Sequence, residues 1–385
     1  MRISGARFYR YSLPFRDAMQ FGSERVGRRE GLIVDIRTDD GGVGYGEIAP
    51  LPGFSKESIE HAHATAVRCI DGLTRRQNVD PRIPTALRDR ETIPPSVRFG
   101  IECALWDLAA RATKASPASL LVENAATRVP VSALLLGDRE RVLADASALK
   151  SSGIAAVKLK VARGAAESEV DTIRRLRELL GIGVAIRLDA NRGWGFDEAL
   201  AFARQAAECN IAYIEEPIAD PQRLAEFAER SPIPFAVDET LQDIGWDQLH
   251  AWRRADLLEP FAEFPDDADP RLRAIVAGRV WVVKPTLVGI SRTYLAGLLA
   301  KQCRIDPDLV VSSSFESGLG LIALANLAAC AGEDALPAGL DTASWLAGDI
   351  LDAPLPLVGG AIDLAEANAT AARFSPDALE EITHD

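Results

Sequence analysis

The feature that most constrains the fold is a repeated alternation of short apolar runs and helix-like segments, which begins near Val129. The runs are rich in β-branched residues, and stretches of roughly 15–25 residues with helical character separate them. This alternation predicts a parallel sheet with crossover helices. Seven or eight such units favour closure into a barrel over an open, doubly wound sheet, which is the second candidate. The runs read VPVSALLLG, AAVKLKVA, VAIRLDANRG, IAYIEEP, PFAVDET, VWVVKP and LVVSSSFES, with a weaker eighth at LPAGLDT.

The rest of the sequence flanks this pattern on both sides. In residues 1–125, LIVDIRTD and VGYGEIAP read as two strands joined by the turn DDGG, and SVRFGIECALWDLAARA reads as an amphipathic helix. The tail, including PLPLVGGAIDL, again resembles strand and is expected to return to the N-terminal unit. We therefore predict an α/β protein with a (β/α)7β TIM-like barrel over 126–345. An N-terminal α+β capping domain (1–125) is completed by the C-terminal segment (346–385).

Composition narrows the classes of function. A length of 385 residues suits a barrel of ~250 residues plus a smaller companion. The net charge of −13 argues against general binding to nucleic acid or to an anionic membrane surface. No apolar run approaches the ~20 residues of a membrane span. The cysteines are scattered and lack CxxC spacing, which disfavours a disulfide framework or zinc site and predicts a cytoplasmic protein. They are Cys69, Cys103, Cys209, Cys303 and Cys330.

Three consecutive runs end in carboxylates. Asp189 lies in LDAN, Glu215 in IEEP and Asp238 in VDET. The C-terminal ends of barrel strands form the catalytic face, so these side chains are expected to lie side by side. Carboxylate oxygens without histidine or cysteine suit a hard cation such as Mg²⁺, which also offsets their mutual repulsion. Each one alone could equally cap a helix or pair with a lysine, but the set predicts a magnesium site.

Two of these carboxylates have an acidic neighbour. Glu216 follows Glu215, and Glu239 follows Asp238. Successive side chains of a strand point to opposite faces, so one member of each pair is expected at the site. The spacing does not choose between the members.

Three lysines also fall at strand ends. Lys158 and Lys160 lie two residues apart in VKLKV, so both leave the same face of one strand. Lys284 ends the run VWVVKP, and we expect it across the barrel from the pair, with the carboxylates on the arc between. Taken alone, Lys284 could instead form a structural salt bridge.

This arrangement suits removal of the proton on the carbon next to a carboxylate of a small-molecule substrate. That proton is weakly acidic, so its removal requires stabilisation of an enediolate, which Mg²⁺ and a lysine ammonium provide. A lysine whose pKa is lowered by burial and by neighbouring positive charge can act as the base.

Other polar residues share this end of the barrel pattern. Arg187 lies on the same strand face as Asp189 and Asn191, and it could hold a substrate carboxylate or form a structural ion pair. Ser312 and Ser313 end the seventh run, where hydroxyl and backbone N–H groups often form an anion pocket. Simple capping of the following helix is the alternative for the serines.

The sequence disfavours two other classes of function. A barrel glycosidase with a carboxylate pair would usually carry several aromatic side chains to stack on sugars, and the aromatic content of 6% argues against it. A non-catalytic binding protein is disfavoured because both lysine sites and all three carboxylates are present.

Together the motifs resemble those of the enolase superfamily, and within it the subgroup related to muconate lactonizing enzyme. The resemblance spans nearly the whole chain and rests on KLK, LDAN, IEEP, VDE and VVKPTLVG. SSSFESGLGL and GYGEIAPLPGFSKES look like the o-succinylbenzoate synthase family. Members of that family make o-succinylbenzoate for menaquinone from 2-succinyl-6-hydroxy-2,4-cyclohexadiene-1-carboxylate, by dehydration. The resemblance implies that Asp189 binds Mg²⁺ together with the first member of each acidic pair, Glu215 and Asp238.

The resemblance also implies roles for the lysines and serines. Lys160 would take the α-proton and return it to the departing hydroxide, while Lys158 stabilises the enediolate and Lys284 lies on its opposite face. The serine run would receive the succinyl carboxylate. Relatives with the same residues racemise acylated amino acids or epimerise dipeptides, so an N-acylamino-acid racemase or dipeptide epimerase is the alternative. Capping loops at Phe15–Arg25 and Leu51–Ser55 are expected to set the substrate.

Overall fold

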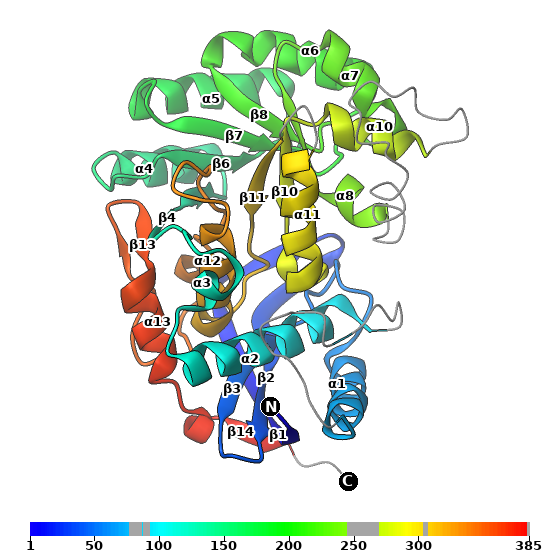
Figure 1. The fold of residues 1–385 in the computed structure, drawn as a ribbon. Helices are drawn as coiled ribbons and strands as arrows, with labels where there is room; N and C mark the ends of the chain where they lie inside the picture. Colours follow the sequence, from blue (N-terminus) through cyan, green and yellow to red (C-terminus); the bar gives the residue numbers. More distant parts are fainter. Residues whose placement is uncertain (77–86, 88–92, 245–268, 303–306, 383–385) are drawn as a thin grey trace.

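The structure is a computed structural model that describes residues 1–76, 87, 93–244, 269–302 and 307–382. It consists of a barrel and a strand-rich cap that lies against one end of it (Figure 1). The predicted fold class is confirmed.

Seven parallel strands form the barrel wall in the order β11-β10-β9-β8-β7-β6-β5, so each pairs with the next in the chain. This sequential order excludes the doubly wound sheet, whose strand order reverses. The weak eighth run lies between the two edges, because Ser312 bridges to Gly339 and Val131 to Ala338 in parallel fashion. The strands are β5 (Ser132–Leu135), β6 (Ala156–Lys160), β7 (Ala185–Asp189), β8 (Ile211–Glu215), β9 (Phe235–Val237), β10 (Val280–Val283) and β11 (Asp308–Val311).

Helices cover the outside of the wall. The helix α5 (Ala166–Leu180) shows why these segments form: Val170, Ile173 and Leu176 recur at helical spacing and are buried, and Gly181 ends the helix with a φ of 72°. The other barrel helices are α4 (Arg139–Leu149), α6 (Phe196–Ala206), α7 (Leu224–Arg230), α8 (Glu239–Asp243), α10 (Pro270–Ala277), α11 (Ile290–Gln302) and α12 (Gly318–Ala329), with 3-10 turns η2 (Ala207–Cys209), η3 (Pro221–Arg223), η4 (Pro285–Leu287) and η5 (Ala343–Trp345).

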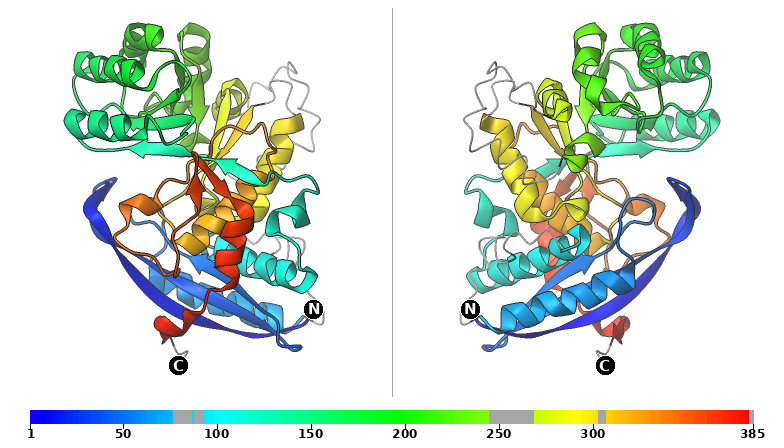
Figure 2. Two further views of the ribbon diagram at one scale, coloured as in Figure 1. Left: turned by 90° about the vertical axis from the view of Figure 1, so that its left-hand side faces the viewer. Right: turned by 90° about the vertical axis from the view of Figure 1, so that its right-hand side faces the viewer.

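The cap is an antiparallel sheet with helices packed on it. The predicted turn between two of its strands is confirmed, since the backbone N–H of Thr38 donates to the carbonyl of Gly42. The β1–β2 hairpin is long and curves up toward the barrel (Figure 2). The cap elements are β1 (Ile3–Phe21), β2 (Glu24–Thr38), β3 (Val43–Ile48), β14 (Glu380–Ile382), α1 (Ile59–Thr74), α2 (Pro95–Thr113) and α3 (Pro117–Leu121).

The expected amphipathic helix is α2, but it is buried on nearly every side. The physical reason is close packing against β3, where Gly46 has no side chain: a Cβ there would lie 1.9 Å from the carbonyl oxygen of Gly100. The other faces of α2 are covered by α1, α3 and α11. The helix was predicted correctly, and its amphipathic character was not.

The C-terminal segment returns to the cap by a different route from the one expected. The PLPLVGGAIDL stretch forms β12 (Leu357–Val358) and β13 (Ala361–Asp363), and β13 pairs with β4 (Arg128–Pro130) beside the barrel. After α13 (Leu364–Ala372) and η6 (Pro376–Ala378), β14 pairs with β1 and completes the cap sheet. The domain boundaries at residues 125 and 345 stay predictions.

No helix in the described ranges is both long and apolar enough to cross a membrane. None of the described cysteines forms a disulfide, and Cys303 lies outside the described residues.

Candidate active site

The two lysines of β6 lie at its C-terminal end and keep the alternation expected of a strand. Lys158 and Lys160 are 15% and 21% exposed, whereas Val157 and Leu159 are buried in the core. A barrel strand faces helices on one side and the barrel interior on the other. Because Val157 and Leu159 pack in the core, the alternating Lys158 and Lys160 face the interior. The structure therefore places both on one face, at the end of the barrel that carries catalytic groups.

Both lysines contact the carboxylates of the next strands. The Lys158 Nζ lies 2.8 Å from Oδ2 of Asp189 and 2.7 Å from Oε2 of Glu215. The Lys160 Nζ lies 2.6 Å from Oδ2 of Asp189 and 2.5 Å from Oδ1 of Asn191. Strand register explains these contacts, because Asp189 is paired with Lys160 on one side and with Glu215 on the other.

Burial and charge separate the ionisation of these groups. Burial and the negative charge of Asp189 raise the pKa of Glu215 to about 8. Burial also acts to raise the pKa of Asp189, but Lys158 and Lys160 hold it well below its usual range. Burial lowers the pKa of Lys160, and the positive charge of Lys158 acts in the same direction. Burial also acts to lower the pKa of Lys158, but the negative charges of Asp189 and Glu215 raise that pKa well above its usual value.

The structure separates the two members of the first acidic pair. Glu216 turns away with a φ of 43°, and its Oε1 accepts the backbone N–H groups of Asp238 at 2.8 Å and Thr240 at 2.7 Å. Its Oε2 accepts from the Thr240 hydroxyl at 2.8 Å and from Arg192 Nε at 3.0 Å. Glu216 therefore braces the start of α8, and Glu215 is the member that faces the lysines.

The second acidic pair contributes both members to this region. Asp238 is fully buried, forms an ion pair with Lys284 and accepts from Gln242 Nε2 at 2.6 Å. Oε1 of Glu239 accepts from Asn191 Nδ2 at 3.1 Å, while its Oε2 is buried without a partner. Burial raises the pKa of Glu239 to about 7. For Lys284, burial acts to lower the pKa, but the negative charge of Asp238 raises it above its usual value.

These groups surround a pocket of about 410 Å³ between the barrel end and the cap. The cap supplies part of the wall from the two loops expected to set the substrate: Met19–Gly22 at the hairpin tip, together with Leu51, Gly53 and Phe54. Phe54 lies over Lys284, whose Nζ is 6.0 Å from the ring centre. The barrel side includes Lys158, Lys160, Glu215, Glu239 and Lys284.

The predicted substrate-binding residues also line the pocket. Arg187 is buried, donates to the Pro337 carbonyl at 2.6 Å and lies over the Tyr213 ring at 5.4 Å, so its hydrogen bond reaches a carbonyl rather than a carboxylate. Ser313 donates to the carbonyl of Gly339 at 2.8 Å and lies 2.9 Å from the Thr342 hydroxyl. Ser312 lies on the pocket wall beside it.

Several buried polar atoms in this pocket lack a hydrogen-bond partner within the described structure. Such atoms are rare in folded proteins and are expected where a ligand supplies the missing partner. They are the Ser132 Oγ, Arg187 Nε, Glu239 Oε2 and Ser314 Oγ.

Three wall residues that sequence reasoning did not select are Ser132, Tyr213 and Asp341. Ser132 is the first residue of β5 and Tyr213 lies in the middle of β8, so a rule that looks at C-terminal strand ends selects neither. Phe54 lies in the loop Leu51–Ser55, which was expected to contact the substrate. Asp341 lies near the end of the weak eighth run, LPAGLDT, and its position there was an available signal.

Comparison with known proteins agrees with this geometry. Residues 3–108 match the family described as MenC, N-terminal domain, and residues 141–260 match Enolase C-terminal domain-like. An o-succinylbenzoate synthase from Pectobacterium atrosepticum is 31% identical over 91% of this chain and 95% of its own length. The chain belongs to the o-succinylbenzoate synthase family of the enolase superfamily.

Solved structures of this superfamily share the fold. A dipeptide epimerase from Enterococcus faecalis, complexed with Mg and the dipeptide L-Leu-L-Tyr, aligns with a TM-score of 0.79, 19% identity and coverage of 94% of this chain and 97% of the epimerase. A muconate lactonizing enzyme from Pseudomonas fluorescens aligns with a TM-score of 0.76, 20% identity and 94% coverage of both chains. The expected resemblance to the muconate lactonizing enzyme subgroup is confirmed.

The predicted metal ligands were tested against the donor set of this enolase-superfamily chain. Across the described ranges, no three acidic, histidine or cysteine side chains converge as a ready cluster, because the carboxylates face lysines instead. The donors nevertheless fit a hard divalent cation, because three carboxylates are buried at the ends of successive strands and carboxylate oxygens are the ligands that such ions prefer. The predicted ligands Asp189, Glu215 and Asp238 stay predictions.

Proposed function

We propose that this chain is an o-succinylbenzoate synthase that dehydrates 2-succinyl-6-hydroxy-2,4-cyclohexadiene-1-carboxylate. The observation that carries the proposal is the position of Lys160 and Lys284 on β6 and at the end of β10, with buried carboxylates on the strands between. The identity of 31% to a curated o-succinylbenzoate synthase over nearly the full length supports this reaction over others of the superfamily.

A divalent cation at Asp189, Glu215 and Asp238, which we propose is Mg²⁺, would supply Lewis-acid stabilisation of the charge that develops on the substrate carboxylate. The Mg bound by the E. faecalis epimerase supports this choice of ion. The ammonium group of Lys158, which is mostly buried and has a raised pKa, adds fixed positive charge beside the same substrate carboxylate.

Lys160 is the proposed base. Its neutral amine takes the proton from the carbon next to the carboxylate, and the electron pair of that C–H bond forms the enediolate. The same Nζ then gives the proton to the departing hydroxyl group as the C–O bond breaks. Water and the aromatic ring of o-succinylbenzoate result, and proton and oxygen leave from the same face. A single lysine at the β6 end accounts for both transfers.

The other pocket residues bind and orient the substrate. Lys284, whose Nζ lies 6.0 Å from the ring centre of Phe54, is proposed to face the side of the substrate ring opposite Lys160. Ser312, Ser313 and the unpartnered Ser314 hydroxyl are proposed to receive the succinyl carboxylate. Arg187, with a free Nε, is proposed to fix the substrate from the other side of the pocket.

The test is to incubate the purified protein and Mg²⁺ with 2-succinyl-6-hydroxy-2,4-cyclohexadiene-1-carboxylate and to follow the ultraviolet absorbance of the substrate. We expect stoichiometric conversion to o-succinylbenzoate, with Lys160→Ala as the inactive control. No product formation by the wild-type protein would reject the dehydration while leaving the family assignment intact.

The second candidate is an N-acylamino-acid racemase or dipeptide epimerase. Two observations favour it: lysines stand on both sides of the pocket, and the fold matches a dipeptide epimerase with a TM-score of 0.79. Such an enzyme uses Lys160 and Lys284 as opposed bases. In D₂O it would exchange the α-proton of both stereoisomers of an N-succinylamino acid or dipeptide, and Lys284→Ala would abolish exchange from one isomer only. A protein that acts solely as a synthase would show no exchange with either isomer.

A further inference from the structure

One basic residue at the mouth of the active-site pocket has no role in the reaction described above. Arg163 lies in the loop between β6 and α5 and lines the pocket together with Lys160. It is exposed, and within the described chain its guanidinium group has no hydrogen-bond or ion-pair partner. The other basic groups of the lining are mostly buried and engaged, because the three lysines contact carboxylates and Arg187 donates to a carbonyl.

The loop that carries Arg163 is held by the helix that follows it. The carboxylate of Glu169, on α5, accepts three successive backbone N–H groups: Ala162 at 3.1 Å, Arg163 at 2.8 Å and Gly164 at 3.1 Å. Successive N–H groups of this kind form a site for an anion, and here a carboxylate of the protein itself fills it. Glu169 therefore fixes the backbone of the loop and leaves the Arg163 side chain free.

The same loop contains a strained residue. Ala162 has a φ of 62°, in the left-handed region that residues with a side chain rarely adopt. It packs against the loop after β7, where a Cβ on Gly193 would lie 2.6 Å from the Cβ of Ala162. Strained backbone persists only where its surroundings hold it, and it is concentrated at functional sites. The two loops together thus hold the Arg163 backbone beside the pocket.

The balance of charge makes an unpaired cation at this position important. The net charge of −13 repels an anionic ligand at long range. The substrate of the proposed function carries two carboxylates, so it is a dianion near neutral pH. Inside the pocket, the positive charges of the lysines are offset by buried carboxylates. At the mouth of the pocket, no ion pair in the described chain offsets the charge of Arg163.

We propose that Arg163 attracts the dianionic substrate to the pocket through its charge, without a fixed contact. This inference rests on the proposed function, which supplies the dianion. An exposed charge at the rim of a binding site acts over a distance set by the ionic strength, and its removal changes the association of a charged ligand and the salt dependence of binding. Arg163 takes no part in the proton transfers, so it contributes to KM and not to kcat.

Kinetics with 2-succinyl-6-hydroxy-2,4-cyclohexadiene-1-carboxylate and Mg²⁺ test this role. At an ionic strength of about 0.01 M, where the Debye length is ~30 Å, Arg163→Gln should raise KM about fivefold and leave kcat unchanged. At about 1 M, where that length is ~3 Å, the two KM values should agree. A raised KM that persists at high salt would overturn the proposal.

Arg163→Lys separates charge from a fixed contact. This variant keeps the positive charge but loses the planar fork that binds a carboxylate through two hydrogen bonds. Its KM should therefore match the wild-type value at both ionic strengths. A KM as high as that of Arg163→Gln would show a direct contact with the substrate, and the proposal would be wrong.

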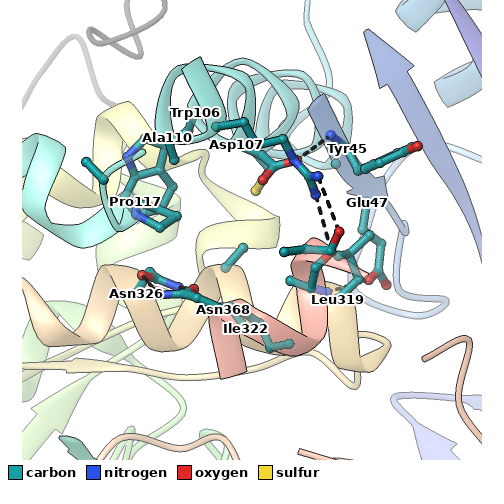
Figure 3. Close-up of a pocket in the computed structure, with 18 of the residues that line it drawn as sticks. Tyr45, Glu47, Trp106, Asp107, Ala110, Pro117, Leu319, Ile322, Asn326 and Asn368 are labelled. Carbon is teal, nitrogen blue, oxygen red and sulfur yellow. Dashed lines mark hydrogen bonds and ion pairs between the residues drawn. The ribbon is translucent and has the colours of Figure 1, made fainter. Parts of the chain in front are cut away.

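Lys114→Gln is the control of matched charge. Lys114 is also exposed, and it lines a second cavity between α2 on one side and α12 and α13 on the other (Figure 3). The lining of that cavity shares no residue with the active-site pocket, so this variant should keep the wild-type KM at both ionic strengths. Equal effects of Lys114→Gln and Arg163→Gln would mean that net charge alone sets the affinity, which would reject a specific role for Arg163.

Binding of o-succinylbenzoate distinguishes failure of this proposal from failure of the proposed function. Titration calorimetry with Mg²⁺ at low ionic strength should give an about fivefold weaker Kd for Arg163→Gln than for the wild type. The loss should be only about twofold for 2-butanoylbenzoate, which lacks the second carboxylate. This pattern in a protein that does not dehydrate the substrate would reject the proposed function and support the role of Arg163. Normal turnover with equal Kd values would reject the role of Arg163 alone, and no binding to the wild type would reject both.

Discussion

The carboxylate of Glu47, on β3 of the cap, accepts hydrogen bonds from both the backbone N–H and the hydroxyl of Ser317, at the start of α12 in the barrel. The two residues are 270 positions apart in the chain. This contact joins the two parts of the molecule directly behind the serine run of the pocket. It also satisfies backbone donors at the N-terminus of α12, where a carboxylate is favoured by the helix dipole.

Replacement of Glu47 by alanine should therefore destabilise the protein. The backbone N–H groups of Ser317 and Gly320 and the Tyr11 hydroxyl would all lose their acceptor in a buried place, and we expect a cost of about 3 kcal/mol in the free energy of unfolding. Urea denaturation measures this. Glu226→Ala is the control, since that exposed carboxylate pairs only with surface arginines and should cost less than about 0.5 kcal/mol. Equal effects of the two substitutions would contradict the structural role of Glu47.

Replacement of Lys160 by alanine tests the base. Because both proton transfers are assigned to its Nζ, we expect kcat to fall by about 10³-fold or more, with an unchanged circular dichroism spectrum and thermal midpoint. Lys150→Ala, at an exposed position on the end of α4, is the matched control and should retain full activity. Wild-type rates in Lys160→Ala would show that the proposed mechanism is wrong.

Removal of metal tests the carboxylates. Dialysis against EDTA should abolish turnover, and added Mg²⁺ should restore it. In titration calorimetry, Asp238→Asn should weaken Mg²⁺ binding by at least about tenfold, since one of three charged ligands is lost. Asp243 lies nearby on α8 but pairs with Arg192. The Asp243→Asn variant should therefore bind Mg²⁺ with the affinity of the wild type. Full activity in EDTA would instead favour a metal-independent reaction such as that of a glycosidase.

The sequence was sufficient to predict the barrel and the strand-end lysines and carboxylates, because these depend on local patterns in the chain. Side-chain alternation within a strand and the common edge of parallel strands require only short stretches of sequence, and these put Lys158 and Lys160 beside Asp189 and Glu215. The choice of Glu215 over Glu216 required the turn after β8, where the backbone of Glu216 adopts a positive φ. That turn depends on hydrogen bonds from α8, which spacing does not reveal.

The features that escaped prediction depend on contacts between distant parts of the chain. β14 has only three residues and is exposed, so no periodicity marks it, and it forms because β1 offers a free edge. The burial of α2 on all sides requires the barrel helices to be in place. Asp341 is different, since its place in the eighth run was visible in the sequence, but its contact with the Leu134 N–H of β5 depends on closure of the barrel.

Asp341 provides a prediction for the dependence of stability on pH. Burial raises its pKa to about 6, although the Leu134 N–H donates to it at 3.2 Å. In the unfolded chain the pKa of aspartate is about 3.9, so the folded state binds the proton more tightly. This contribution to stability is present in acid, falls as the pH rises from about 4 to 6, and is lost above that range. A shift of about two pKa units corresponds to roughly 3 kcal/mol.

Asp341→Asn keeps an oxygen acceptor for the Leu134 N–H but cannot ionise. The wild-type protein should therefore lose about 3 kcal/mol of unfolding free energy relative to Asp341→Asn between pH 4 and pH 7, as measured by urea denaturation at each pH. Asp71→Asn, at an exposed position, is the control, and its difference from wild type should stay within about 0.5 kcal/mol throughout. A difference for Asp341→Asn that does not vary with pH would contradict the prediction, because it would mean that the pKa of Asp341 is the same in the folded and unfolded states.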